Sequence, residues 1–65
     1  MKVEIKPIEN VRDGDQLKNG ETIIDAYYNN SGNYSLVIER YDTNGEMSTH
    51  EISYPPGSFV RIVNF

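Results

Sequence analysis

The chain has 65 residues, a net charge of −4, one histidine and no cysteine. A chain of this length buries only about 60% of its unfolded surface, so we expect a single domain over residues 1–65 with one hydrophobic core. The lack of cysteine excludes a disulfide framework, and a lone histidine excludes the usual structural zinc sites. We therefore predict a core of apolar side chains alone, with no metal and no cofactor.

Charge and hydropathy patterning bear on partners and location. The six Lys and Arg residues are scattered along the chain, whereas binding to a phosphate backbone needs a basic patch, so direct nucleic-acid binding is disfavoured. The lack of cysteine fits a reducing compartment, and residues 1–5 alternate charged with apolar side chains where a signal peptide needs an apolar run. No apolar run approaches the roughly 20 residues of a membrane helix. We predict a cytoplasmic protein without membrane contact.

The first third of the chain predicts one strand followed by turns. Val3 and Ile5 alternate with charged residues, which is typical of a half-buried strand that Pro7 ends or confines to a sheet edge. Residues 11–17 contain the turn signal Asp-Gly-Asp, and residues 18–21 contain a second turn signal. The segment between them is too short for a helix.

The middle of the chain predicts a hairpin. Residues 21–28 form a run rich in β-branched and aromatic side chains, and the polar loop 29–33 closes it. Residues 34–41 are the most apolar stretch, and their Leu-Val-Ile centre offers apolar atoms to both faces of a sheet. We expect residues 34–41 to be the central strand.

The turn at residues 42–45 allows two registers for the next hairpin. A two-residue turn at Asn44 and Gly45 would place Ile38 opposite Glu51, apolar against charged. A three-residue loop with a left-handed Gly45 matches apolar with apolar instead. We predict this bulged loop, with the pairs Tyr41–Met47, Leu36–Ile52 and Tyr34–Tyr54.

That register divides the side chains between two faces. The core face holds Tyr34, Leu36, Ile38, Ile52 and Tyr54. We expect His50 opposite Ile38 on the core side, with its ring packed or bonded to the backbone. The other face holds Ser35, Val37, Glu39, Tyr41, Met47, Thr49, Glu51 and Ser53.

The C-terminal residues complete the predicted sheet. The Pro-Pro-Gly segment 55–57 stops the fourth strand, and residues 58–65 form a fifth, with Val60 and Ile62 in the core. About five short antiparallel strands predict an all-β fold, either a small barrel or a half-open roll. Closure is attractive because it removes sheet edges that would otherwise aggregate.

The chemistry-bearing residues do not predict an enzyme. A catalytic set would have to combine His50 with a serine and an acid, types that any chain of this size contains by chance. Residues 13–15 with Glu9 offer oxygen ligands, but they lack the spacing of a calcium loop, and we interpret them as a turn. We predict no catalytic residue and no metal site.

The tyrosines are the most suggestive feature for binding. Tyr27 and Tyr28 are adjacent in a predicted strand, so they point to opposite faces and at least one can leave the core. An exposed Tyr41 near acidic side chains is either a hot spot for a protein partner or an aromatic side chain that shields the sheet. The candidate partner-binding residues are Tyr27, Glu39, Tyr41, Met47 and Glu51.

Residues 11–17, Gly20, the strand 22–26 and the hairpin at 44–46 together resemble the opening of small Src-homology-like barrels. Proteins of this kind are often accessory products of bacteriophages and mobile elements. The resemblance implies a small barrel that binds and modulates a host or viral protein. The sequence motif and the tryptophan of eukaryotic peptide-binding members are absent, so binding to proline-rich peptides is not implied.

Three functions remain open on these grounds. The first is a non-enzymatic protein-interaction module of the phage accessory type, with another protein as its partner. The second is an acidic nucleic-acid mimic that inhibits a nucleic-acid-binding enzyme. The third is a structural component of a virion or larger complex. We expect a monomer or a weak homo-oligomer.

Overall fold

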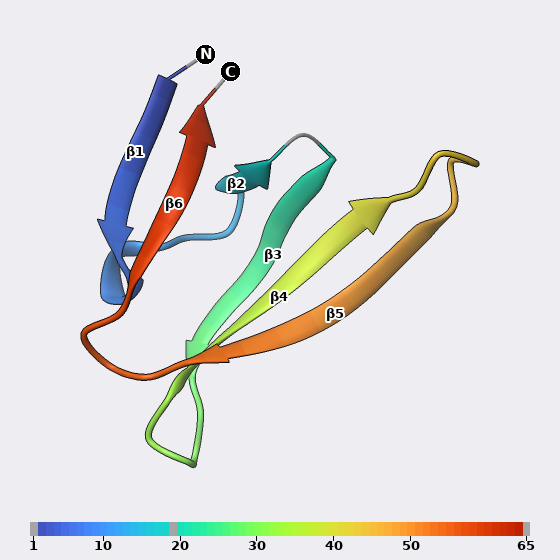
Figure 1. The fold of residues 1–65 in the computed structure, drawn as a ribbon. Helices are drawn as coiled ribbons and strands as arrows, with labels where there is room; N and C mark the ends of the chain where they lie inside the picture. The colour runs from blue at the N-terminus through green and yellow to red at the C-terminus, as the bar shows by residue number, and fades with distance from the viewer. Residues whose placement is uncertain (1, 19, 65) are drawn as a thin grey trace.

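A computed structural model describes residues 2–18 and 20–64, and its strands form one antiparallel sheet. The sheet order is β1-β6-β2-β3-β4-β5 (Figure 1). The strands are β1 (Lys2–Pro7), β2 (Gln16–Lys18), β3 (Glu21–Tyr28), β4 (Tyr34–Tyr41), β5 (Met47–Tyr54) and β6 (Phe59–Asn64), and a 3₁₀ helix, η1 (Ile8–Asn10), follows β1. The all-β prediction is confirmed, with six strands in place of about five.

The sheet is not closed into a barrel. Its outer strands, β1 and β5, pair only with β6 and β4, respectively, within the described part of the chain. Figure 1 shows two limbs, one of β1 and β6 and the other of β3, β4 and β5, with the short β2 between them. The half-open roll is therefore correct and the closed barrel is wrong, and both outer strands keep a free edge.

Strand β2 was not predicted because three residues are too few to show an alternating pattern. Gln16 nevertheless pairs with Thr22 of β3 and with Val63 of β6. A bulge between Gln16 and Lys18 shifts the register toward β3. This short strand alone joins the two limbs within the sheet.

The predicted loop between β4 and β5 is confirmed. Gly45 has a φ of 81°, its N–H donates to Asp42 O at 3.0 Å, and Asp42 N–H donates to Glu46 O at 3.0 Å. The Asp42 carboxylate accepts further bonds from the N–H groups of Asn44 and Glu46, both at 2.9 Å. The register that follows contains the predicted pairs Tyr41–Met47, Leu36–Ile52 and Tyr34–Tyr54.

The core lies on the face of the sheet that this register predicts. Leu36 and Ile38 are fully buried, and Tyr34, Ile52 and Tyr54 are partly buried and pack against them. The remaining buried members of the cluster are Ile8, Val11, Ile23, Val60 and Ile62. The predicted core positions Val60 and Ile62 are thus confirmed, and Phe65, the last residue of the predicted fifth strand, lies outside the described residues.

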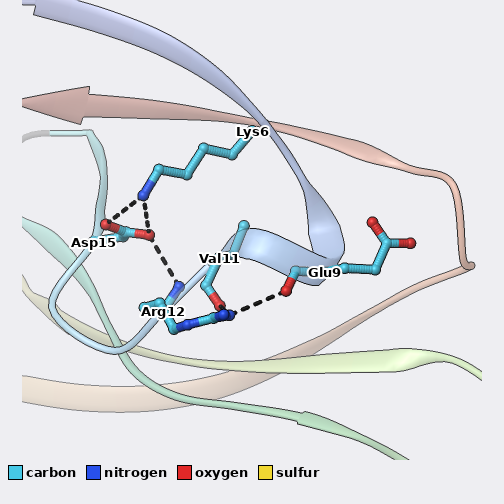
Figure 2. Close-up of polar contacts among 5 residues, drawn as sticks. All are labelled: Lys6, Glu9, Val11, Arg12 and Asp15. Atoms are coloured by element: carbon cyan, nitrogen blue, oxygen red, sulfur yellow. Dashed lines mark hydrogen bonds and ion pairs between the residues drawn. The ribbon is translucent and has the colours of Figure 1, made fainter.

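Polar contacts hold η1 and the following turn against β1 (Figure 2). Lys6 Nζ lies 3.2 Å from Asp15 Oδ2, and the same oxygen accepts the Arg12 backbone N–H at 3.0 Å. Arg12 Nη1 in turn donates to the carbonyl oxygens of Glu9 and Val11, at 3.0 and 3.2 Å. These bonds fix the segment that delivers the first core side chains after β1.

Strand β1 faces opposite to the expectation of a half-buried strand. Val3 and Ile5 are 41% and 60% exposed, whereas Glu4 pairs with Ile62 and so lies on the core side of the sheet. The apolar side chains of β1 are not needed for the core because η1 supplies Ile8, which is 2% exposed. Pro7 was predicted either to end the strand or to confine it to an edge; β1 both ends at Pro7 and is an outer strand of the described sheet.

We expect Ile8→Ala to lower the free energy of unfolding by about 2–5 kcal/mol and Ile8→Val by about 1 kcal/mol, because each leaves a cavity in the core. The matched control is Ile24→Ala, since Ile24 is 43% exposed and its truncation opens no buried cavity. Urea unfolding followed by circular dichroism measures all three. Equal losses for Ile8→Ala and Ile24→Ala would contradict a structural role for η1.

Candidate functional site

The candidate site is the face of β3, β4 and β5 that points away from the core, which we call the outer face. Alternation along the strands, together with the observed register, assigns side chains to it. All five predicted partner-binding residues belong to this face. Its members are Thr22, Asp25, Tyr27, Ser35, Val37, Glu39, Tyr41, Met47, Thr49, Glu51 and Ser53.

A hydrogen bond joins two of the predicted residues across three strands. Tyr27 Oη on β3 donates to Glu51 Oε2 on β5 at 2.7 Å. The two strands lie about 9.5 Å apart, two strand spacings, so both side chains must reach over β4. Ser35 of β4, opposite Tyr27, lies between them and is 0% exposed. The small serine leaves the room in which the two longer side chains meet.

Asn29 connects this bond to the hairpin loop between β3 and β4. Its Nδ2 donates to Ser35 Oγ at 2.9 Å, and its Oδ1 accepts the N–H groups of Ser31 and Asn33 at 2.9 and 3.0 Å. Sequence reasoning missed the roles of Asn29 and Ser35. A small polar residue inside the most apolar strand was the available signal.

The bond between Tyr27 and Glu51 shifts the pKa values of both groups, in directions that reinforce the states they would have at neutral pH without it. The hydrogen bond from Tyr27, followed by one from Ser35, lowers the pKa of Glu51 below its ordinary 4.5. The same bond to Glu51 is the main reason that the pKa of Tyr27 is raised above 10.0. At neutral pH the carboxylate is therefore charged and the phenol keeps its proton as a hydrogen-bond donor.

Tyr41 and Met47 form a second group at the other end of the outer face. They lie directly opposite each other and are 56% and 53% exposed. Tyr41 lies six positions from Ser35 along β4, or about 20 Å at the usual rise of a strand, and Met47 lies four positions from Glu51 along β5, or about 13 Å. The structure thus brings Tyr27 to Glu51 and Tyr41 to Met47, but it keeps the two pairs apart, with Glu39 between them.

The outer face is acidic. It carries the carboxylates Asp25, Glu39 and Glu51, and none of its members is Lys or Arg. Strand β4, predicted to be the central strand, lies between β3 and β5 and is next to an edge of the described sheet, so that prediction is wrong for the sheet as a whole. The basic residue of β4, Arg40, lies on the other face, where its Nη1 is 3.3 Å from Glu21 Oε2. The mild acidic excess of the whole chain is therefore concentrated on this surface.

His50 is opposite Ile38, as predicted, but the expectation of a packed ring is wrong. Its side chain is exposed, as are the other residues from Met47 to Glu51. The reason is that β5 is an outer strand with a neighbour on one side only, so the core-side surface of its first half is not covered by a further strand.

The Asp-Gly-Asp segment is a turn, as predicted. Gly14 has a φ of 94° and its N–H donates to Ile23 O at 2.7 Å, while the Asp15 carboxylate is bonded to Lys6 and to the Arg12 N–H. Among residues 2–18 and 20–64, no group of three or more acidic or histidine side chains is placed to hold a metal ion.

A shallow hollow between β2 and β6 is lined by Gly14, Gln16, Val63 and Asn64, which offer neither an acid nor a base. None of the helical residues that the structure describes belongs to a helix long and apolar enough to cross a membrane.

We expect Tyr27→Phe to raise the pKa of Glu51 toward 4.5, because it removes the hydrogen bond that chiefly lowers it. Because the pKa of Glu51 is lower in the folded than in the unfolded protein, its ionised carboxylate stabilises the fold above about pH 4.5. This stabilisation is lost as the pH falls through the pKa that Glu51 has in the folded protein. The stabilities of wild type and Tyr27→Phe should therefore converge in acid. Side-chain carboxyl shifts in an NMR titration report the pKa, and Tyr28→Phe, which leaves the Tyr27–Glu51 bond in place, is the control. An unchanged Glu51 pKa in Tyr27→Phe would contradict the bond.

Comparisons with known protein families, with curated proteins and with solved structures returned no match.

Proposed function

We propose that this protein is a non-enzymatic interaction module that binds another protein through the outer face of β3, β4 and β5. The observation that carries the proposal is the combination of three carboxylates, no basic side chain and an exposed Tyr41–Met47 pair on one sheet surface. Tyrosine and methionine are enriched in protein interfaces, where they supply apolar contact area. An acidic face with such anchors suits a partner whose contact surface is basic around an apolar centre.

The Tyr27–Glu51 bond supports binding in a different way. Ordering rotamer-rich side chains at an interface costs about 0.5–1.5 kcal/mol each. Tyr27 and Glu51 are already held at 2.7 Å from each other in the free protein, and the fully buried Ser35 lies between them. This part of the outer face is thus pre-organised, and its charged carboxylate is available to a Lys or Arg of the partner.

We further propose that the module is an accessory protein of the phage type, which binds and modulates one host or viral protein. Small size, net acidity and the sequence resemblance of residues 11–17 and 22–26 to accessory proteins of this kind support the assignment, whereas the open sheet departs from the barrel that the resemblance implies. The acidic mimic of nucleic acid is a distinct hypothesis, because its partner would be a nucleic-acid-binding groove. Both hypotheses predict that affinity falls as salt rises, because both pair the acidic face with a basic surface. Only mimicry predicts competition with nucleic acid.

The test compares tagged wild-type protein with the double variant Tyr41→Ala, Met47→Ala as baits in a lysate of the source organism. Captured proteins are identified by mass spectrometry, and the affinity of each purified candidate is then measured. For a hot spot worth about 2 kcal/mol we expect at least a roughly 30-fold weaker affinity in the double variant. Circular dichroism establishes that the variant is folded.

The matched control is Tyr28→Ala, because Tyr28 is 60% exposed but lies on the opposite face of β3. It should bind with wild-type affinity. A folded double variant that keeps full affinity would contradict the proposal. Displacement of the partner by DNA or RNA would establish the mimic instead.

A further inference from the structure

The free edge of β1 combines exposed apolar side chains with an unpaired backbone. Val3 and Ile5 are 41% and 60% exposed on the face away from the core, and β6 is the only strand beside β1 in the described sheet. Apolar side chains along an unpaired strand edge are a template for pairing with another chain. The outer strand β1 is thus a second surface, separate from the outer face of β3, β4 and β5.

The phase of the hydrogen bonds shows which groups are available there. Ile8 N–H donates to Ser58 O at 2.9 Å, which continues the ladder of β1 with β6. Because bonded and non-bonded pairs alternate in an antiparallel ladder, the even-numbered residues of β1 bond to β6 and the odd-numbered ones face outward. Val3 and Ile5 therefore direct their N–H and C=O groups to the free edge. Pro7 is also odd-numbered, so its backbone faces the free edge too, and there its lack of an N–H leaves no bond to β6 unmade.

Charge restricts how two β1 edges can pair about a two-fold axis. Hydrogen bonds form only in registers that set odd-numbered residues of the two copies opposite each other. Because Pro7 has no N–H, we consider the three registers that pair Val3 and Ile5 with each other or with themselves. A register that sets Glu4 opposite Glu4 of the second copy also opposes lysine to lysine, which is unfavourable. In a register centred on Val3, Glu4 of each copy lies opposite Lys2 of the other copy. In a register centred on Ile5, Glu4 of each copy lies opposite Lys6 of the other copy. Each of these registers therefore contains two pairs of unlike charges.

We propose that two copies of this chain associate through their β1 edges, antiparallel and centred on Val3. In this register Lys2 of each copy lies opposite Glu4 of the other, and the two Val3 residues exchange backbone hydrogen bonds. The register centred on Ile5 would pair Glu4 with Lys6 of the other copy, but Lys6 already forms an ion pair with Asp15 of its own chain at 3.2 Å. Lys2 and Glu4 are exposed and make no ion pair with any other described residue.

The other free edge of the sheet offers no such match. Glu51 is the only Asp, Glu, Lys or Arg residue of β5, so pairing β5 with itself sets no acid opposite a Lys or Arg. Antiparallel pairing of β1 with β1 gives a dimer and no larger species, because each copy has a single free β1 edge and the pairing uses both of them. The resulting particle is a dimer whose sheet continues from one chain into the next, with the outer faces of β3, β4 and β5 left uncovered.

The experiment measures self-association by sedimentation equilibrium at low ionic strength on the full chain, with the variants Lys2→Glu and Glu4→Lys. Wild type should form dimers at high concentration. Each single variant opposes like charges twice and should raise the dissociation constant by about tenfold. An equimolar mixture of the two variants opposes unlike charges again and should dimerise as wild type does.

The matched control is Arg61→Glu, a charge reversal on the neighbouring strand β6 that leaves the paired edge unchanged; it should dimerise as wild type does. Strictly monomeric wild type at millimolar concentration would overturn the proposal, and so would a series of larger species, which requires pairing of β1 with β5. Weaker association of Glu4→Lys with no effect of Lys2→Glu would overturn the Val3 register. Partner binding through Tyr41 and Met47 is measured separately and does not depend on this result.

Discussion

Gly45 is the residue on which the assignment of faces depends. Its left-handed backbone, with a φ of 81°, makes the loop three residues long and not two. One residue of difference in a hairpin would transfer every side chain of β5 to the opposite face. The burial of Leu36 against Ile52 and the meeting of Tyr27 with Glu51 therefore both follow from this loop.

The open shape of the sheet depends on a different constraint. The strands β1 and β6 pair along their whole length, while β2 joins them to the rest of the sheet through the pair of Gln16 and Val63. The core between the limbs is completed by Ile8 and Val11, which the contacts around Asp15 and Arg12 hold in place. Because these side chains complete the core, closure of the sheet between β1 and β5 is not required.

The same architecture separates two surfaces with different chemistry. The outer face of β3, β4 and β5 is acidic, partly pre-organised and suited to a basic partner. The edge of β1 is apolar on one face and carries alternating charges on the other, which suits a second copy of itself. Each surface can be altered without the other, so the proposed partner binding and the proposed self-association can be tested independently.

The sequence by itself determined the strands with strong alternation or long apolar runs, the loop at Gly45 and the face of each residue in β4 and β5. These features are local, because the period of a strand and the geometry of a turn are properties of neighbouring residues. The candidate residues Glu39, Tyr41, Met47 and Glu51 could be assigned to one face on this basis. The face of Tyr27 follows instead from the pairing of β3 with β4, whose register shifts between Ile23 and Asp25.

Only the tertiary structure decided which groups meet. The bond from Tyr27 to Glu51 joins residues 24 positions apart over Ser35, and no local pattern encodes such a contact. Packing also decided which face of β1 meets the core. Alternation shows that a strand has an apolar face but does not show which face lies against the core. Ile8 occupies the core position that was expected for Val3 and Ile5. The exposure of His50 followed in the same way from its position on an outer strand.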